Sequence, residues 1–226
     1  MKYQNIKEAK FLSRPNRFIA QIEIDGNMEV CHVKNTGRCR ELLIPGADIF
    51  VRQADNPNRK TKYDLIGVYK GDRLVNIDSQ VVNQVFHEWV LSSNYFPGIS
   101  LIKPEYRYKH SRFDFYLETE HQKILVEVKG VTLEEGNVAM FPDAPTERGV
   151  KHINELVESM GDGYQPYIAF IIQMKDVAYF TPNGKTHREF ADALKAAAEK
   201  GVKVLALDCI ITPDSIVAGD FVPVRL

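Results

Sequence analysis

Alternating hydrophobic and polar positions in the first 80 residues predict short β-strands separated by turns. Residues 18–24 (FIAQIEI) and 28–33 (MEVCHV) flank the turn Asp25-Gly26-Asn27, a pattern typical of a β-hairpin. Further strands are expected at residues 41–44, 47–52, 63–69 and 73–77. So many short strands in so short a segment favour a small closed barrel. An OB-like barrel is the natural candidate, and such barrels often bind nucleic acids.

Longer elements follow from about residue 81. Apolar spacing predicts helices at residues 82–91, 149–160 and 187–200, and strands at residues 112–117, 123–131, 167–174 and 202–207. Residues 132–145 are expected to form a polar loop. The order β-β-α-β-α-β predicts a mixed sheet with helices packed on it. We therefore expect an α/β protein, α+β overall, with a barrel domain at residues 1–80 and a sheet domain at residues 81–226.

Composition narrows the class of protein. The 226 residues are 44% hydrophobic and 26% charged, as in an ordinary soluble globular protein. Nothing approaches the apolar length of a membrane span. The first residues, MKYQNIKEAKF, hold no apolar signal core, so we expect a cytoplasmic protein. The three cysteines, Cys31, Cys39 and Cys209, are expected to be free thiols, because their spacing suits no metal site.

Charge is distributed unevenly along the chain. The net charge is −1, but residues 1–80 hold 14 Lys and Arg against 10 Asp and Glu, whereas residues 81–226 hold 15 against 20. This asymmetry fits a phosphate-binding module joined to a carboxylate-rich metal site. It also fits chance, because a difference of a few charges is small.

Two carboxylates and a lysine lie on two strands that we expect to pair. In residues 112–117, Asp114 is predicted to point away from the face of Phe113 and Phe115; in residues 123–131, Glu127 and Lys129 share one face. Adjacent carboxylates repel unless a cation joins them. The pattern therefore indicates a hard divalent ion, Mg²⁺ or Mn²⁺, that stabilises phosphoryl charge and activates water.

Each of these residues has another interpretation. The Lys129 ammonium is placed to orient the attacking water or to stabilise developing charge, and Glu105 upstream could supply a third metal-binding carboxylate or a base. A Glu-x-Lys on a strand face, however, is usually a solvated ion pair, and a lone Asp in a strand often lies near a turn.

The wider sequence adds a resemblance to known families. Asp114 followed by Glu127-Val128-Lys129 resembles the core of the PD-(D/E)XK nucleases, although Phe113 stands where that pattern has proline. The strings NRFIA, KNTGRCRELLIPG, RKTKYDL, SRFDF, EVKGVTL and FPDAPTERGVKHINEL together resemble the SfsA (sugar fermentation stimulation protein A) family. That resemblance implies an OB-like domain followed by a nuclease-like domain, DNA binding with little sequence preference, and a link to sugar-utilisation genes.

Basic and amide side chains at strand ends and at one helix start are candidates for nucleic-acid binding. The candidates are Arg14, Asn16, Arg17, Asn35, Arg38, Arg40, Arg59, Lys60, Lys62, Arg112, Thr146, Arg148, Lys151 and His152. Any one of them could equally be an ordinary surface residue, and His152 could equally be a satisfied structural histidine. Gly37 is expected to supply a positive φ in a turn.

Two functions of different classes follow. The first is a DNA-binding protein of low sequence specificity with a metal-dependent phosphodiesterase site. The second is a DNA-binding regulator of maltose-type sugar-utilisation genes that keeps the nuclease scaffold but cleaves nothing. A nuclease acting on RNA is a weaker third hypothesis. Two carboxylates facing a phosphate would repel it in a pure binder, which favours the enzyme. The sequence leaves open whether the DNA is single- or double-stranded and whether the protein is a homo-oligomer.

Overall fold

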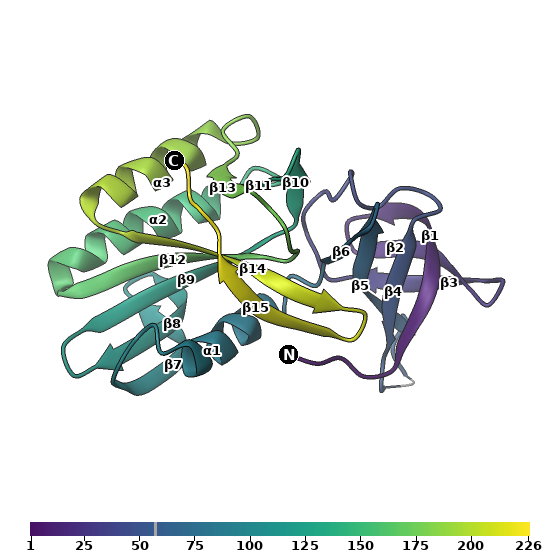
Figure 1. Ribbon diagram of the computed structural model, residues 1–226, viewed down its shortest axis with the longest axis horizontal. Helices are drawn as coiled ribbons and strands as arrows, with labels where there is room; N and C mark the ends of the chain where they lie inside the picture. The colour runs from purple at the N-terminus through teal and green to yellow at the C-terminus, as the bar shows by residue number, and fades with distance from the viewer. Residues whose placement is uncertain (57) are drawn as a thin grey trace.

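The computed structural model describes residues 1–56 and 58–226, and its first part is a closed barrel (Figure 1). Six strands follow the order β3-β2-β1-β4-β5-β6, and an additional parallel pairing of β3 with β5 closes the sheet. The strands are β1 (Ile6–Asn16), β2 (Ile19–Ile24), β3 (Asn27–Val33), β4 (Asp48–Gln53), β5 (Tyr63–Lys70) and β6 (Arg73–Asn76). This confirms the predicted OB-like barrel.

Two local predictions in the barrel differ from the structure. The predicted strand at residues 41–44 is wrong: Leu42 and Leu43 both donate backbone hydrogen bonds to the Cys39 carbonyl and form a tight turn. Both leucines are buried, which is why the segment has the apolar character of a strand. Strand β1 was missed because only Ala9 and Phe11 of its eleven residues are buried, so its apolar alternation is weak.

The second part of the chain contains a six-stranded mixed sheet in the order β15-β14-β12-β9-β8-β7. Strands β9, β12 and β14 are parallel to one another, and the outer pairs are antiparallel. The strands are β7 (Ile99–Tyr108), β8 (Ser111–Thr119), β9 (Lys123–Val131), β12 (Tyr164–Ile172), β14 (Lys203–Thr212) and β15 (Ser215–Phe221). Strands β7 and β15 form the two edges, and the apolar pattern did not predict either of them.

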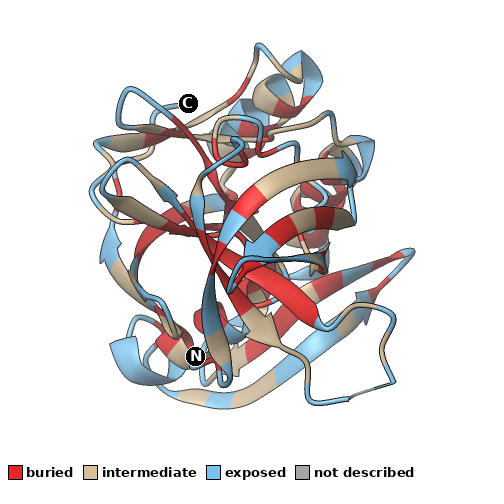
Figure 2. Ribbon diagram, turned by 90° about the vertical axis from the view of Figure 1, so that its right-hand side faces the viewer, coloured by how far each residue is buried: buried red, intermediate tan, exposed pale blue. Residues whose placement is uncertain are grey.

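Helices cover both faces of this sheet (Figure 1). Helix α1 (Val82–Ser93) packs on one face, where Phe86 joins Phe115, Val126 and Val128 in one apolar cluster. Helices α2 (Glu147–Ser159) and α3 (Arg188–Lys200) pack on the other face with Leu125 and Phe170, and a short 3₁₀ helix (Met160–Asp162) follows α2. Figure 2 shows the buried residues concentrated along the strands between these layers. The parallel strands are therefore buried on both faces, as the apolar segment at residues 167–174 predicts.

A small third sheet occupies the segment that was expected to be a polar loop. Strand β10 (Leu133–Glu135) pairs with β11 (Val138–Phe141), which runs parallel to β13 (Tyr179–Pro182). The prediction failed because these strands are only three or four residues long, too short to show a period.

The barrel and the sheet share a continuous seam. Gln173, at the end of β12, donates its amide to the Asn76 side chain and to the Asp78 carbonyl. At the N-terminus, the Met1 ammonium bonds Glu88 of α1. All three cysteines are free, as predicted, and all three are buried. No helix within residues 1–56 and 58–226 is long and apolar enough to cross a membrane.

Candidate active site between two helix starts

A cavity of about 530 Å³ lies where the N-termini of α1 and α2 approach strands β8 and β9. Asp114, Glu127 and Lys129 all line it. It is completed by residues that precede or begin the two helices and by the backbone of β9: Ser79, Gln80, Val82, Asn83, Val128, Gly130, Thr146, Arg148 and Gly149. The structure therefore brings together the three residues that the spacing singled out.

Strands β8 and β9 separate at Asp114, and this opens the cavity. Their ladder runs from Glu118–Lys123 to Phe115–Val126 and ends there. Beyond it, Asp114 Oδ2 accepts a hydrogen bond from the Val128 backbone N–H at 2.7 Å. The side chain of Asp114 thus substitutes for a backbone carbonyl of β8, so it is held rigidly at the point of divergence.

The divergence also changes which way the neighbouring side chains point. Phe113 lies in the apolar cluster under α2, whereas Phe115 lies in the cluster under α1. The prediction that Phe113 and Phe115 share one face is therefore wrong. Strict alternation along a strand holds only while the strand remains regularly paired.

Glu127 is held by two donors on the same oxygen. Its Oε1 lies 2.5 Å from the Lys129 Nζ and 2.5 Å from the His152 Nδ1. The Arg148 Nε donates to the other ring nitrogen of His152 at 3.4 Å. That ring nitrogen therefore carries the lone pair, and Nδ1 carries the proton donated to Glu127. Glu127 Oε2 is buried and has no hydrogen-bond partner among the described residues.

The pKa values of the two carboxylates are shifted in opposite directions. Burial, and next the negative charge of Glu127, raise the pKa of Asp114 to about 6. Burial also opposes ionisation of Glu127, but the hydrogen bond from His152 and the charge of Lys129 hold its pKa below the usual value. Glu127 is therefore ionised at neutral pH, and its negative charge disfavours ionisation of the neighbouring Asp114.

This donor set fits one hard divalent cation that keeps several water ligands. In the described part of the chain, no three His, Cys, Asp or Glu side chains are grouped closely enough to hold a metal ion. Two carboxylates with one partnerless buried oxygen suit Mg²⁺, which is commonly bound by one or two carboxylates together with water and substrate phosphate. The structure does not bring Glu105 into the cavity: its carboxylate pairs with Arg112 at 2.7 Å on the exposed surface of β7 and β8.

The residues predicted at the start of α2 have different environments. Thr146 is the N-cap, and its hydroxyl accepts the Gly149 N–H at 3.1 Å. Arg148 is exposed at the cavity wall, whereas Lys151 points outward beside Glu155. His152 is only 4% exposed, so its ring faces Glu127 rather than the surface.

A second cavity, of about 520 Å³, collects most of the predicted basic residues of the barrel. Its lining is Arg14, Asn16, Arg17, Thr36, Gly37, Arg38, Arg40, Ala144 and Pro145. We call it the arginine cavity. The guanidinium of Arg14 donates to four backbone carbonyls, those of Arg17, Asn35, Gly37 and Arg38, so it organises the loop. Asn16 and Asn35 likewise bond backbone N–H groups through their side-chain oxygens.

The other predicted basic cluster lies apart from both cavities. Arg59 forms two hydrogen bonds to the buried Asp64 carboxylate, and Lys62 pairs with Glu29 at 3.1 Å. Lys60 is exposed. None of the three lines the arginine cavity or the candidate active-site cavity, the one lined by Asp114, Glu127 and Lys129.

Asp143 joins the two parts of the chain beside the arginine cavity. Its Oδ2 accepts the backbone N–H of Cys39 at 2.8 Å. A Cβ on Gly37 would lie 2.9 Å from this same oxygen and 2.9 Å from the Asn35 Oδ1. Gly37 does not have a positive φ, so the expectation of a left-handed turn residue is wrong. The glycine is needed because two side-chain oxygens approach where its Cβ would be.

Sequence reasoning missed Asn83 and Asp143. The Nδ2 of Asn83 donates to Asp114 Oδ1 at 2.7 Å, which helps to orient the carboxylate. Its position in the first turn of a predicted helix was the only available signal. Asp143 follows Glu127 in the chain and lies in an irregular segment, where no local pattern marks it.

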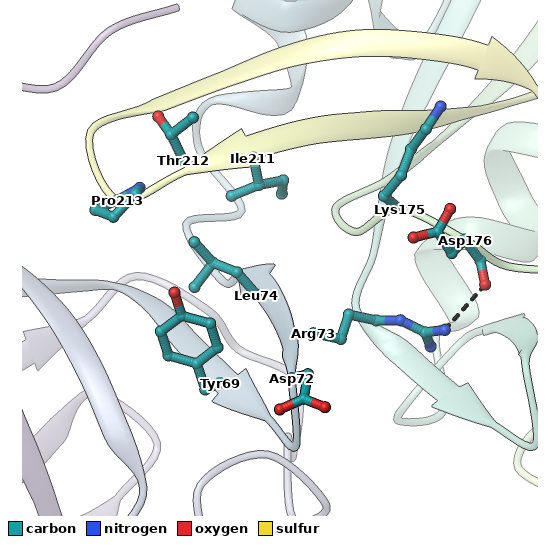
Figure 3. A pocket seen from close by; sticks show the side chains of 9 residues that line it. All are labelled: Tyr69, Asp72, Arg73, Leu74, Lys175, Asp176, Ile211, Thr212 and Pro213. Atoms are coloured by element: carbon teal, nitrogen blue, oxygen red, sulfur yellow. Dashed lines mark hydrogen bonds between the residues drawn. The ribbon is translucent and has the colours of Figure 1, made fainter.

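A third hollow, of about 540 Å³, lies between the β5–β6 and β14–β15 hairpins (Figure 3). Its cations have partners: Arg73 donates to the Asp176 carbonyl, and Lys175 pairs with Asp208 and Asp220. It contains none of the residues described above and forms part of the seam between barrel and sheet.

Known proteins resemble this chain along its whole length. Residues 12–77 match the family model described as "SfsA N-terminal OB domain", and residues 79–215 match "Sugar fermentation stimulation protein RE domain". The sugar fermentation stimulation protein homolog of Clostridium beijerinckii is 61% identical over 226 residues, covering 100% of both chains. The homolog of Desulfitobacterium hafniense strain Y51 is 66% identical, covering 100% of this chain and 99% of its own.

A solved structure of a relative also superimposes on the chain. Pyrococcus furiosus SfsA, described as a complex with Ca²⁺, has a TM-score of 0.90 and 31% identity, covering 100% of this chain and 98% of its own. The arrangement of barrel and sheet is therefore shared between distant relatives.

Proposed function

The chain belongs to the sugar fermentation stimulation protein (SfsA) family, and we propose that it is a DNA-binding protein of low sequence specificity that hydrolyses phosphodiester bonds with Mg²⁺ or Mn²⁺. One observation carries the proposal. Glu127 is buried and kept ionised, with one oxygen held by His152 and Lys129 and the other without a partner among the described residues, and it lines the same cavity as Asp114.

The charges support a cation between the two carboxylates. Burying two carboxylates costs free energy unless positive charge compensates them. Lys129 forms its ion pair with Glu127 and not with Asp114. Asp114 and Glu127 would hold the cation, which supplies charge stabilisation at the phosphate and a water of lowered pKa. The name of the Pyrococcus furiosus structure includes Ca²⁺, a hard oxygen-binding dication, and this supports the choice of metal class.

The remaining side chains have separate roles in this proposal. The Lys129 ammonium, with one of its three donors committed to Glu127, can orient the attacking water or stabilise charge on the phosphoryl oxygens. His152 fixes the Glu127 carboxylate, and Asn83 fixes that of Asp114. Arg148, exposed at the rim, can hold a substrate phosphate oxygen.

Cleavage of labelled single- and double-stranded DNA, with Mg²⁺ or Mn²⁺, tests the proposal. We expect cutting by the wild-type protein, and a loss of at least a hundredfold in Asp114→Asn and Glu127→Gln. Glu120→Gln is the matched control, because it removes an 86%-exposed carboxylate at the β8–β9 turn. DNA affinity, measured separately in EDTA, should survive all three substitutions.

Either of two results would contradict the proposed phosphodiesterase activity. One is tight DNA binding without cutting of any DNA or RNA substrate with either metal. The other is equal cutting by the wild type and Asp114→Asn. The first would favour the alternative, a non-catalytic DNA-binding regulator of sugar-utilisation genes, with which the name of the family is in keeping.

A further inference from the structure

Three arginines beside the barrel loop are free to bind an anion. Arg17, Arg38 and Arg40 are exposed and line the arginine cavity. Within residues 1–56 and 58–226 none of them forms an ion pair; the arginines that do so are Arg52, Arg59, Arg73, Arg112 and Arg188. Arginine guanidinium groups that face a cavity without carboxylates are suited to phosphate oxygens.

An exposed aromatic ring adjoins these arginines. Phe18 directly precedes β2 in the turn after β1, is 51% exposed, and has the Arg17 guanidinium 5.9 Å from its ring centroid. Its backbone N–H is fixed by the Asn16 side chain at 2.9 Å, and its carbonyl accepts the Val33 N–H. The ring is therefore held at the surface by its backbone rather than by packing, which leaves a face open for another flat group.

Neighbouring residues of one segment, 144–149, line the arginine cavity and the candidate active-site cavity. Ala144 and Pro145 line the first, and Thr146, Arg148 and Gly149 line the second. The hydrogen bond from Cys39 to Asp143 fixes this segment to the barrel loop. A polynucleotide chain held by the arginines can thus continue over residues 144–149 to the buried carboxylates.

From these observations we propose that the protein grips a single DNA strand, with phosphates on Arg17, Arg38 and Arg40 and a base stacked on Phe18, and that this strand leads into the catalytic cavity. This rests on the proposed function in that DNA is the substrate. A base in a duplex is stacked between its neighbours, so it cannot offer its face to Phe18, whereas a single strand can. Glu127 is 3% exposed at the floor of its cavity, a depth that suits a flexible strand better than a stiff helix.

Binding measured without metal separates this proposal from catalysis. The probes are a fluorescent 20-nucleotide deoxythymidine strand and a 20-base-pair duplex, titrated with the full-length protein in EDTA. We expect the single strand to bind more tightly, and Phe18→Ala to weaken its binding by roughly tenfold while changing duplex binding little. The matched control is Met28→Ala, which truncates a 71%-exposed side chain at the other end of the same hairpin.

The charged contacts give a second readout. Arg38→Gln and Arg40→Gln should each weaken strand binding and reduce its salt dependence, whereas Arg188→Gln, an 80%-exposed arginine on α3, should not. Duplex binding as tight as single-strand binding, or equal affinities for Phe18→Ala and Met28→Ala, would overturn the proposal. Because no cleavage is measured, a protein that never cuts DNA can still pass this test, and a nuclease can still fail it.

Discussion

His152 and Glu127, 25 residues apart in the sequence, meet at 2.5 Å in the buried interface between α2 and the sheet. The ring nitrogen that faces Glu127 donates, because Arg148 donates to the other ring nitrogen. One carboxylate oxygen is thereby committed to His152 and Lys129, and the other remains free for the cavity. Under the proposed function, this relationship gives His152 the role of a positioning residue rather than of a group that contacts DNA.

Replacement of His152 should therefore impair cleavage without impairing binding. We expect His152→Leu to lower the cleavage rate by about 10- to 100-fold, the range seen when a hydrogen-bond partner of a metal ligand is lost. His152→Asn, whose amide can reach Glu127 from a similar position, should recover part of the rate. Lys151→Gln, an exposed neighbour on the same helix, should change little. A large loss of DNA affinity in EDTA for His152→Leu would instead indicate direct contact with the substrate.

The pKa of Asp114 predicts how stability depends on pH. Its folded-state pKa of about 6 lies above the usual value of 3.8 for an aspartate in an unfolded chain, so between these values the folded state holds a proton that the unfolded state has lost. The metal-free protein therefore loses stability as pH rises through this window. Asp114→Asn should remove that loss and be more stable at pH 7.5, by on the order of 2 kcal/mol.

Thermal unfolding in EDTA at pH 4.5 and pH 7.5 measures this difference. The stability gain of Asp114→Asn should be clear at pH 7.5 and much smaller at pH 4.5. A gain of the same size at both values, or a variant less stable than wild type at pH 7.5, would show that the buried charge is not the cause.

The sequence predicted the three candidate site residues better than it predicted their surroundings. Asp114, Glu127 and Lys129 were found because two strands close in sequence place them within reach of each other. The contact between His152 and Glu127 depends on how α2 docks, and no local pattern encodes that. Asp143 was overlooked for the same reason: its partner, the Cys39 N–H, lies 104 residues away.

For the fold, too, the elements with a clear local pattern were the ones that could be predicted. Strands with a buried face on both sides, such as β9 and β12, were predicted because their apolar residues run almost without interruption. The edge strand β7 was not predicted, because most of its residues are exposed or only half-buried. It also contains Pro104, which is tolerated in an edge strand because no ladder hydrogen bond is lost there. A strand with few buried residues on either face leaves too weak a period to read from one sequence.

Addition of a divalent cation should stabilise the protein through the two carboxylates. At about 100 times its dissociation constant, a ligand that binds only the folded state adds about 2.7 kcal/mol, which raises the melting temperature by several degrees in a protein of this size. We expect this shift with Ca²⁺, Mg²⁺ or Mn²⁺ in the wild type and in Glu120→Gln, and its reversal by EDTA. Asp114→Ala and Glu127→Gln should show little shift. An undiminished shift in both would locate the cation elsewhere.

The last prediction concerns the joint between barrel and sheet. In Gly37→Ala the new methyl group would lie 2.9 Å from both Asn35 Oδ1 and Asp143 Oδ2, closer than real Cβ contacts. Asp143 must then move away, and the Cys39 N–H loses its partner. We expect a destabilisation of about 1–3 kcal/mol, the usual cost of an unsatisfied buried donor. Single-strand binding should weaken as well, because the same loop carries Arg38 and Arg40.

Gly161→Ala is the matched control, since Gly161 has open space around its Cβ position and lacks a positive φ. It should leave both the melting temperature and strand affinity close to wild type. Asp143→Ala removes the acceptor without crowding the loop, so it separates the lost hydrogen bond from the steric effect. If Gly37→Ala matched Gly161→Ala in both measurements, the Asp143–Cys39 bond would not be what holds the arginine cavity against the catalytic cavity. If Asp143→Ala reproduced the loss of strand binding, the joint itself would be part of the DNA path.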